Sequence, residues 1–196
     1  MCGRYAFFAP ADALRRWFDL PQAPELPARY NIAPTQDVPV LRETAPGRRE
    51  VALLRWGLVP SWAGDPSIGQ RMINARAETL AERPAYRGAF RSRRCAVLAS
   101  GWYEWQPTAA GKQPFFLRHR DGEPLAFAGL WERWVDRASG EAGQSSTIGP
   151  TPPPAPPGAG LAAGRQGETE PSPRPRPVTD PPHDGPQLIE RLPAAG

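Results

Sequence analysis

RCAVLASGWYEWQPTAAGKQPFFLRH, residues 94–119, holds two apolar and aromatic runs (94–105 and 114–119), separated by the glycine-containing segment 107–112. Runs of this kind, bounded by proline, glycine and charge, are typical of strands, and the segment between them is typical of a hairpin loop. Further runs of the same character are VPVL (38–41), EVALLRWGLV (50–59) and LAFAGLW (125–131). The pattern predicts strands that follow one another directly along the chain.

Helical patterns are few. PADALRRWFD (10–19) opens with a proline suited to a first helical turn and then places its leucine, tryptophan and phenylalanine on one face. ETLAERPAYRGAF (78–90) indicates helical turns broken at Pro84. Few helices among consecutive strands indicate an α+β fold built mostly on antiparallel β-sheet, and a chain of 196 residues suits one domain.

The C-terminal quarter has a different composition. All 7 Trp, 4 Tyr and 7 Phe residues lie at or before Trp134, whereas 14 of the 47 residues from Pro150 to Gly196 are proline. Such a segment lacks the apolar surface that would offset the entropy cost of ordering it. The foldable part is therefore expected to end near Val135. SGEAGQSS (139–146) would lead into a disordered Pro/Arg/Gly-rich tail over residues 149–196.

The positive charge is concentrated before that tail. The net charge is +4; residues 1–135 carry 19 basic and 13 acidic residues, and residues 136–196 carry 5 basic and 7 acidic residues. A basic excess of this size fits either a solubilising surface or a surface that follows nucleic-acid phosphates. Charge alone does not decide between them.

Cysteine content and hydropathy limit the cellular compartment expected for the protein. Two cysteines are too few for a disulfide scaffold and match no zinc spacing. The N-terminus has no secretory pattern, and no run of 18 or more apolar residues is present. These features predict a cytoplasmic protein with reduced thiols.

Cys2 directly follows the initiator methionine. Removal of Met1 would expose a 1,2-aminothiol, with an amine of pKa roughly 8 beside a thiol of pKa about 8.5. Such a pair captures aldehydes: the amine forms a Schiff base and the thiolate then closes a thiazolidine ring. An internal cysteine has no free amine for this reaction. The alternative is that a cysteine stands at position 2 by chance.

Seven sequence blocks occur in a fixed order and together cover about the first 135 residues. They resemble the SOS-response-associated peptidase (SRAP) family in MCGRYA (1–6), ARYNIAPTQ (28–36), LRWGLVPSWA (54–63), MINARAETL (72–80), RRCAVLASGWYEW (93–105), QPFFL (113–117) and LAFAGLWERW (125–134). The resemblance implies a barrel-like antiparallel SRAP domain over residues 1–148. It also implies binding of single-stranded DNA at abasic sites, covalent crosslinking, and autoproteolytic loss of Met1. No metal, cofactor or membrane is implied, and a monomer that associates with the nucleoid when bound to DNA is expected.

The resemblance assigns roles to three residues. Cys2 is the crosslinking nucleophile, Asn74 lies by the abasic sugar, and Glu104 is the catalytic carboxylate. The sequence around Glu104 adds a physical expectation, because aromatic residues flank it on an apolar strand. Desolvation there would raise the pKa of Glu104 and suit it to proton transfer near neutral pH. The alternative is a solvated strand carboxylate.

Binding of a single strand needs cations for phosphates and aromatic faces for bases. Arg4, Arg76 and Arg83 are the candidate phosphate contacts, and Trp62 is the candidate for stacking, with a core position as its alternative. Cys95, inside an apolar strand, is interpreted as a small buried hydrophobe.

The chain departs from the family after its last strand. The family continues with a TIITT-like strand, an H-x-R-M-P-like motif and a helix, whereas here only TIG (147–149) matches and His183 lacks the arginine. The domain is thus interpreted as C-terminally incomplete and the tail as an off-frame translation. Asn31 and Pro34 are expected to shape the loop that holds the N-terminus, and His119 is expected at the surface.

Two other functions stay open. One is an inactive fragment that binds single strands without a covalent step. The other is an amidohydrolase with an N-terminal cysteine, since Met-Cys-Gly also opens glutamine amidotransferases, although those chains are much larger.

Overall fold

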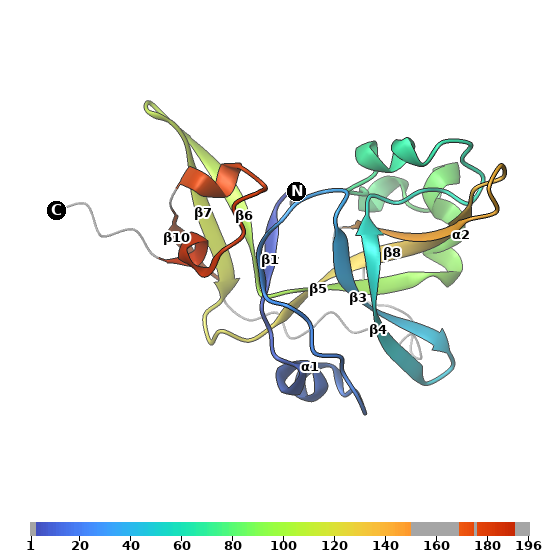
Figure 1. The fold of residues 1–196 in the computed structure, drawn as a ribbon, viewed down its shortest axis with the longest axis horizontal. Helices are drawn as coiled ribbons and strands as arrows, with labels where there is room; N and C mark the ends of the chain where they lie inside the picture. Colours follow the sequence, from blue (N-terminus) through green and yellow to red (C-terminus); the bar gives the residue numbers. More distant parts are fainter. Residues whose placement is uncertain (1–2, 150–168, 175, 191–196) are drawn as a thin grey trace. The chain divides into compact units, whose positions relative to one another are not determined.

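The computed structural model describes residues 3–149, 169–174 and 176–190. The chain forms two compact units, not the single domain expected from its length (Figure 1). Unit 1 combines Met1–Ala33, Ala99–Leu125 and Arg165–Gly196, and unit 2 combines Pro34–Leu98 and Ala126–Gly164. Two units result because each has a sheet with its own apolar cluster.

Unit 1 is built on a five-stranded sheet in the order β10-β7-β6-β1-β2, in which the pairings between neighbours are antiparallel. Its strands are β1 (Tyr5–Phe7), β2 (Arg29–Ile32), β6 (Gly101–Thr108), β7 (Gly111–His119) and β10 (Thr169–Pro173). The expected hairpin is confirmed, with a turn at residues 109–110 between β6 and β7. Glycine is required at position 101, the first residue of β6, because a Cβ would clash with the ring of Phe116 on β7.

The expected amphipathic helix is also confirmed, as α1 (Ala11–Phe18) in unit 1. Of the predicted apolar face, Leu14 and Phe18 are buried and Trp17 is partly buried. Asp19 ends the helix in the left-handed region with φ 50°. The apolar spacing of the sequence is therefore the pattern that the helix buries.

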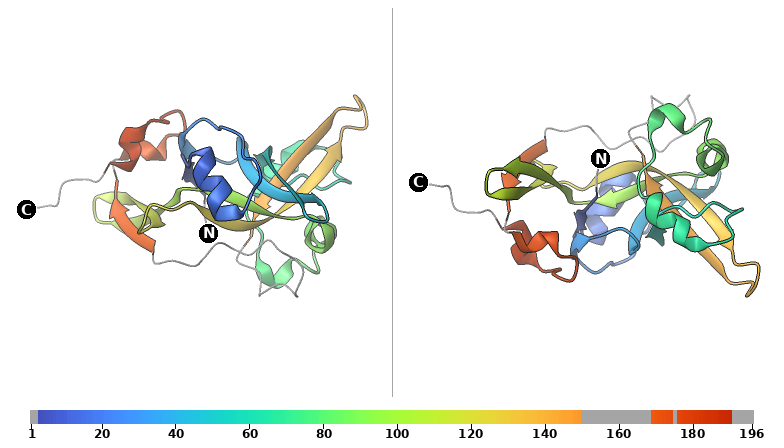
Figure 2. Two further views of the ribbon diagram at one scale, coloured as in Figure 1. Left: turned by 90° about the horizontal axis from the view of Figure 1, so that it is seen from below. Right: turned by 90° about the horizontal axis from the view of Figure 1, so that it is seen from above.

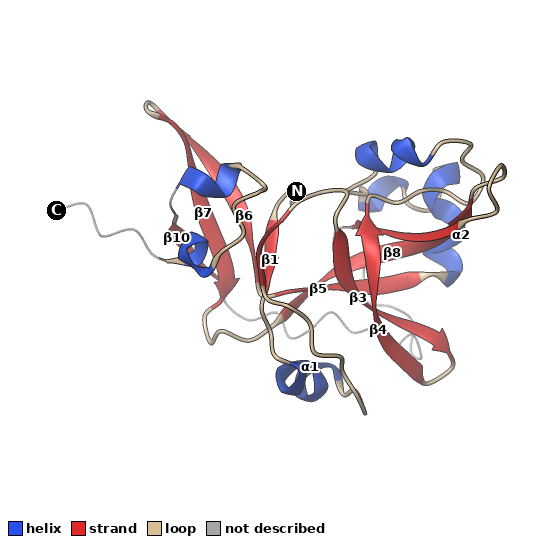
Figure 3. Ribbon diagram, in the orientation of Figure 1, coloured by secondary structure: helices blue, strands red, loops and turns tan. Residues whose placement is uncertain are grey.

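Unit 2 contains a closed barrel in the order β3-β4-β9-β8-β5. Its strands are β3 (Asp37–Ala45), β4 (Arg48–Trp56), β5 (Arg94–Ala99), β8 (Leu125–Val135) and β9 (Ala142–Ile148). The run expected as one strand over 94–105 instead divides at Ser100 into β5 and β6. A mostly antiparallel α+β fold with a barrel is confirmed, and Figure 3 shows the strands in red and the helices in blue.

The strand β9 corrects the expectation that folding ends near Val135. It pairs antiparallel with β8 from Gly129↔Ile148 to Val135↔Ala142 and parallel with β4 at Trp56↔Ser146. Its residues are small and polar, so the sequence resembles a linker. Backbone hydrogen bonds on both sides order it, because the barrel would otherwise be left with an open edge.

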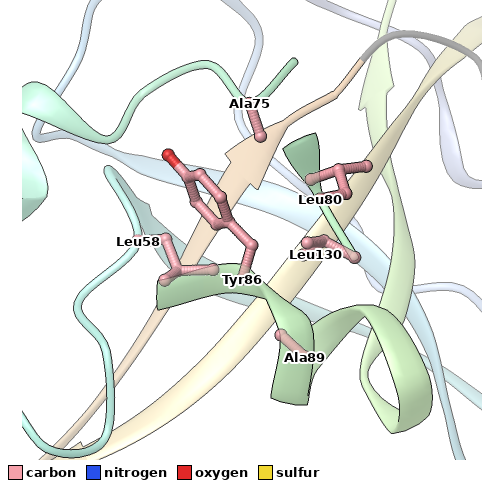
Figure 4. Close-up of a cluster of buried hydrophobic side chains, with 6 residues drawn as sticks. All are labelled: Leu58, Ala75, Leu80, Tyr86, Ala89 and Leu130. Atoms are coloured by element: carbon pink, nitrogen blue, oxygen red, sulfur yellow. The ribbon is translucent and has the colours of Figure 1, made fainter. Parts of the chain in front are cut away.

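The helix α2 (Pro84–Ser92) begins at Pro84, so the helical turns expected over 78–90 are indeed broken at this proline. Pro84 occupies the start of the helix, where its missing N–H needs no partner and its fixed φ suits the first turn. The preceding turn is the 3-10 helix η2 (Ala77–Thr79). Figure 4 shows Tyr86 of α2 packed with buried side chains that also include Leu130 of β8.

Part of the expected disordered tail is folded in unit 1. Strand β10 lies along the outer side of β7 (Figure 2), followed by η3 (Arg176–Thr179) and η4 (Pro186–Ile189). Prolines are tolerated in β10 because it is an edge strand with one side free of ladder bonds. Val178 and Leu188 join the buried cluster of unit 1. The expectation of a disordered tail is therefore wrong for residues 169–174 and 176–190.

Residues 150–168, 175 and 191–196 of the expected tail lie outside the described residues. An off-frame origin of the tail stays a prediction, which translation of the gene in its other frames would test.

Candidate nucleic-acid interface

The predicted nucleophile Cys2 lies outside the described residues. Arg4, two residues later, precedes β1, and its carbonyl oxygen accepts a hydrogen bond of 2.9 Å from the Tyr103 amide. The pairing Tyr5↔Trp102 continues this ladder between β1 and β6. Unit 1 thus brings the backbone of Arg4 beside the strand that carries Glu104.

Glu104 is exposed, which contradicts the expected desolvation of its carboxylate. Side chains alternate along β6, and the neighbouring Tyr103 takes the inward position, where its ring packs 4.9 Å from that of Phe116. Glu104 consequently lies on the opposite side of the strand. Tyr103 and Trp105, which flank Glu104 in the sequence, do not shield its carboxylate, because alternate residues of a strand face opposite ways.

The Arg4 guanidinium is half-buried and bonded within unit 1. Its Nη1 donates to Asn31 Oδ1 at 2.8 Å and to the Val178 carbonyl at 2.9 Å. Burial lowers the pKa of Arg4, while the charge of Asp180 acts in the opposite direction. An arginine stays protonated at physiological pH nevertheless, so Arg4 keeps its positive charge.

Asn31 and Asp184 organise the surroundings of Arg4. Asn31 is fully buried and donates from Nδ2 to the carbonyls of Asp180, at 2.9 Å, and His183, at 2.6 Å. The Asp184 carboxylate accepts from the amides of Tyr30 and Asn31 and pairs with Arg29. The sequence by itself does not reveal this role of Asp184, because no local pattern joins residues about 150 positions apart.

Unit 2 holds Asn74 in a segment that follows the 3-10 helix η1 (Pro66–Arg71). Asn74 is partly buried and forms a parallel bridge with Ile148 of β9. The carbonyl of Ile73 accepts from the Ile148 amide at 3.1 Å and from Trp56 Nε1 at 2.8 Å. The backbone on both sides of Asn74 is therefore anchored to the barrel.

Trp62 also belongs to unit 2, and its side chain is 52% exposed. The alternative of a core position is therefore wrong. The loop after it is held by Trp134, whose Nε1 donates to the Ala63 carbonyl at 2.6 Å. Trp62 thus presents an aromatic face to solvent from an anchored loop.

Arg76 and Arg83 complete the predicted cations, and both are exposed in unit 2. Arg76 precedes η2, and Arg83 precedes α2 and accepts from the Tyr86 amide through its carbonyl. Their phosphate contacts stay predictions, as do the catalytic roles of Asn74 and Glu104.

Two further expectations concern buried groups. Cys95 is 4% exposed and burial raises the pKa of its thiol, so its interpretation as a small buried hydrophobe is confirmed. His119 is 9% exposed, with its ring centroid 6.2 Å from that of Trp17, so the expected surface position is wrong. The helix α1 supplies that tryptophan.

Within the described ranges, no group of three or more His, Cys, Asp or Glu side chains is arranged to hold a metal ion. None of the helices in the same ranges is long and apolar enough to span a membrane.

Comparison with known proteins defines the class. The model of the family described as SOS response associated peptidase (SRAP) matches residues 1–155. Two crystal structures share the fold. One is a Bacteroides thetaiotaomicron protein, with 26% identity and a TM-score of 0.65 over 76% of this chain and 67% of that one. The other is a phage-related protein of Bordetella bronchiseptica, with 30% identity and a TM-score of 0.59 over 76% and 68%.

The chain belongs to the SRAP family. Abasic site processing protein YoaM of Bacillus subtilis is 39% identical over 138 residues, which cover 68% of this chain and 60% of YoaM. Abasic site processing protein YedK of Escherichia coli is 33% identical over 138 residues, covering 66% and 59%. Abasic site processing protein HMCES of Xenopus tropicalis is 29% identical over 191 residues, covering 76% and 57%. The match to YoaM thus spans 60% of that relative's length.

Proposed function

We propose that this protein binds single-stranded DNA and links covalently to the aldehyde of an abasic site through Cys2. The observation that carries the proposal is the family match over residues 1–155, together with the names of the relatives, which are abasic site processing proteins. The cysteine at position 2 supplies the chemistry that an aldehyde requires.

The covalent step begins once Met1 is removed. The α-amine of Cys2 attacks the aldehyde carbon, and loss of water leaves an imine. The Cys2 sulfur then adds to the imine carbon while the nitrogen takes up a proton. New C–N and C–S bonds close a thiazolidine ring, and no oxidant or cofactor is consumed. Hydrolytic removal of Met1 by the protein itself, which gives the family its peptidase name, is part of the proposal.

Glu104 and Asn74 assist this reaction in the proposal. The sugar of an abasic site is mostly ring-closed, and a carboxyl group that moves a proton at its ring oxygen opens it to the aldehyde. Glu104 is exposed on β6, so its carboxylate is accessible to the sugar. Asn74, held by backbone bonds next to Ile73 and Ala75, offers a carboxamide to the sugar.

DNA binding in the proposal uses a stacking face and several cations. The exposed indole of Trp62 would stack on a base beside the abasic gap, and Arg76 and Arg83 would contact phosphates. Arg4 would contribute the charge nearest to Cys2 in the sequence. The test is incubation of the full chain with a single-stranded oligonucleotide that carries one abasic site. An adduct that survives SDS and heat supports the proposal, and absence of such an adduct contradicts it.

A second candidate is binding of single strands without a covalent step. The family pattern includes an H-x-R-x-P motif after the last strand, and the described residues 169–174 and 176–190 of unit 1 do not contain it. This departure favours binding without the covalent step. The histidine in that region, His183, is exposed and lies 3.3 Å from Asp180. Salt-sensitive binding without any adduct would identify this function.

A further inference from the structure

The C-terminal segment, defined here as residues 178–190, contacts Arg4. In the proposed function, Arg4 is the DNA-binding residue nearest to Cys2 in the sequence. The Val178 carbonyl accepts from Arg4 Nη1 at 2.9 Å, and Val178 itself is fully buried. Arg4 is thus bonded to a residue 174 positions away in the chain. The orientation of its guanidinium depends on where this segment lies.

Asn31 links Arg4 to the same segment a second time. Its Oδ1 accepts from Arg4, and its Nδ2 donates to the carbonyls of Asp180 and His183. Both hydrogens of the amide and one lone pair of its oxygen are therefore used. Because a carboxamide combines an acceptor with two donors, neither aspartate nor alanine at position 31 could make all three bonds.

Asp184 fixes the segment onto β2. Its Oδ1 accepts from the amides of Tyr30 and Asn31, the latter at 2.8 Å, and its Oδ2 pairs with Arg29. The carboxylate is largely sheltered, with a side-chain exposure of 23%. Charge-assisted bonds to backbone amides in such a place are stronger than neutral ones.

We infer that Asn31 and Asp184 are positioning residues for Arg4: they dock the C-terminal segment on β2 and so orient the Arg4 guanidinium for a DNA phosphate. The inference rests on the proposed function in taking Arg4 as a phosphate contact. A long cationic side chain that is held in place before binding loses less conformational freedom when the phosphate arrives.

The first test measures affinity for an unmodified single-stranded oligonucleotide at several salt concentrations. Arg4→Gln should weaken binding roughly 3- to 10-fold and reduce the slope of log K against log salt by about 0.7, the value for one phosphate on a single strand. Asp184→Asn should cause a similar loss in the wild-type background and no further loss in the Arg4→Gln background. Glu190→Gln removes an equal charge at an exposed position of the same segment and should leave affinity unchanged.

Two outcomes of this test separate the inference from the proposed function. If Arg4→Gln weakens binding and Asp184→Asn does not, or if their effects add, the positioning role is wrong. If Arg4→Gln leaves binding unchanged, the phosphate contact of the proposed function is wrong, and the second test alone decides the positioning role.

The second test needs no DNA. Slowly exchanging guanidinium NMR signals of Arg4 report its bonds to Asn31 and Val178. They should be lost or broadened in Asp184→Asn and in Asn31→Asp, retained in Glu190→Gln, and restored in part by Asp184→Glu. Circular dichroism of each variant shows whether the fold is kept. Unchanged Arg4 signals in a folded Asp184→Asn variant would overturn the inference.

Discussion

Ala75 donates a backbone hydrogen bond of 2.8 Å to the carbonyl oxygen of Ile148. The Ile148 amide in turn donates to Ile73, so the peptide on each side of Asn74 is bonded to β9. Strand β9, whose sequence resembles a linker, therefore fixes the backbone around Asn74. A site loop bonded to a closed barrel is positioned more accurately than a free loop.

Cys2→Ala should abolish the SDS-stable adduct with abasic single-stranded DNA, because the thiazolidine needs both the thiol and the free amine. A variant that retains Met1 should fail in the same way. Gel electrophoresis after heating measures the adduct. Cys95→Ala is the matched control, since Cys95 is buried and should not react. An adduct that persists in Cys2→Ala would falsify the thiazolidine mechanism.

Glu104→Gln should slow crosslinking by roughly 10²–10⁴-fold, the usual contribution of a general acid–base, while affinity for intact single strands stays the same. The amide is nearly isosteric but transfers no proton at neutral pH. Single-turnover rates at saturating DNA give the first quantity and anisotropy gives the second. Glu141→Gln, at another exposed glutamate, should change neither quantity. Equal losses of rate and affinity would make Glu104 a binding or structural residue.

Trp62→Ala should weaken binding of single strands by about 1–3 kcal/mol through the loss of one stacked base. Its effect on thermal stability should be small, because the side chain is 52% exposed. Leu53→Ala provides a close control, since Leu53 is 55% exposed in the same unit and has no aromatic face. If both variants bind DNA like the wild type, Trp62 is not a stacking residue.

The buried thiol of Cys95 predicts a pH dependence of stability. Burial raises the pKa of Cys95 above its ordinary value of 9.0, so above pH 9 the unfolded chain loses a proton that the folded chain keeps. The unfolded state then binds fewer protons, and the free energy of unfolding falls as pH rises, by about 1.4 kcal/mol per pH unit for one group.

Denaturant titrations of the wild type and Cys95→Ala between about pH 8 and pH 10 measure this effect. Below pH 9 the difference between the two should stay constant, and above it the wild type should lose stability more steeply. Tyr86 and Tyr103, whose pKa values burial also raises, contribute equally to both proteins. Parallel curves across the whole range would contradict the prediction.

The sequence by itself determined the features that depend on near neighbours. The hairpin over 94–119 follows from two apolar and aromatic runs around a glycine-containing segment, and the helix near residues 10–19 follows from apolar residues spaced three to four apart. The structure has both, as β6–β7 and α1. The α+β class follows from the order of these elements. The sequence also indicated the family, because each of the matching blocks is a continuous run of residues. The reactivity expected of Cys2 needs only its place after Met1.

Tertiary structure alone decided the rest, because the responsible forces act between distant residues. Strand β9 has little local preference and is ordered by the ladders that close the barrel. Proline-rich β10 is ordered because it pairs at a sheet edge. Glu104 is exposed because Tyr103 occupies the inward side of β6. The link from Asp184 through Asn31 to Arg4 spans nearly the whole chain, and hydrogen bonds over such separations leave no periodic trace in a sequence.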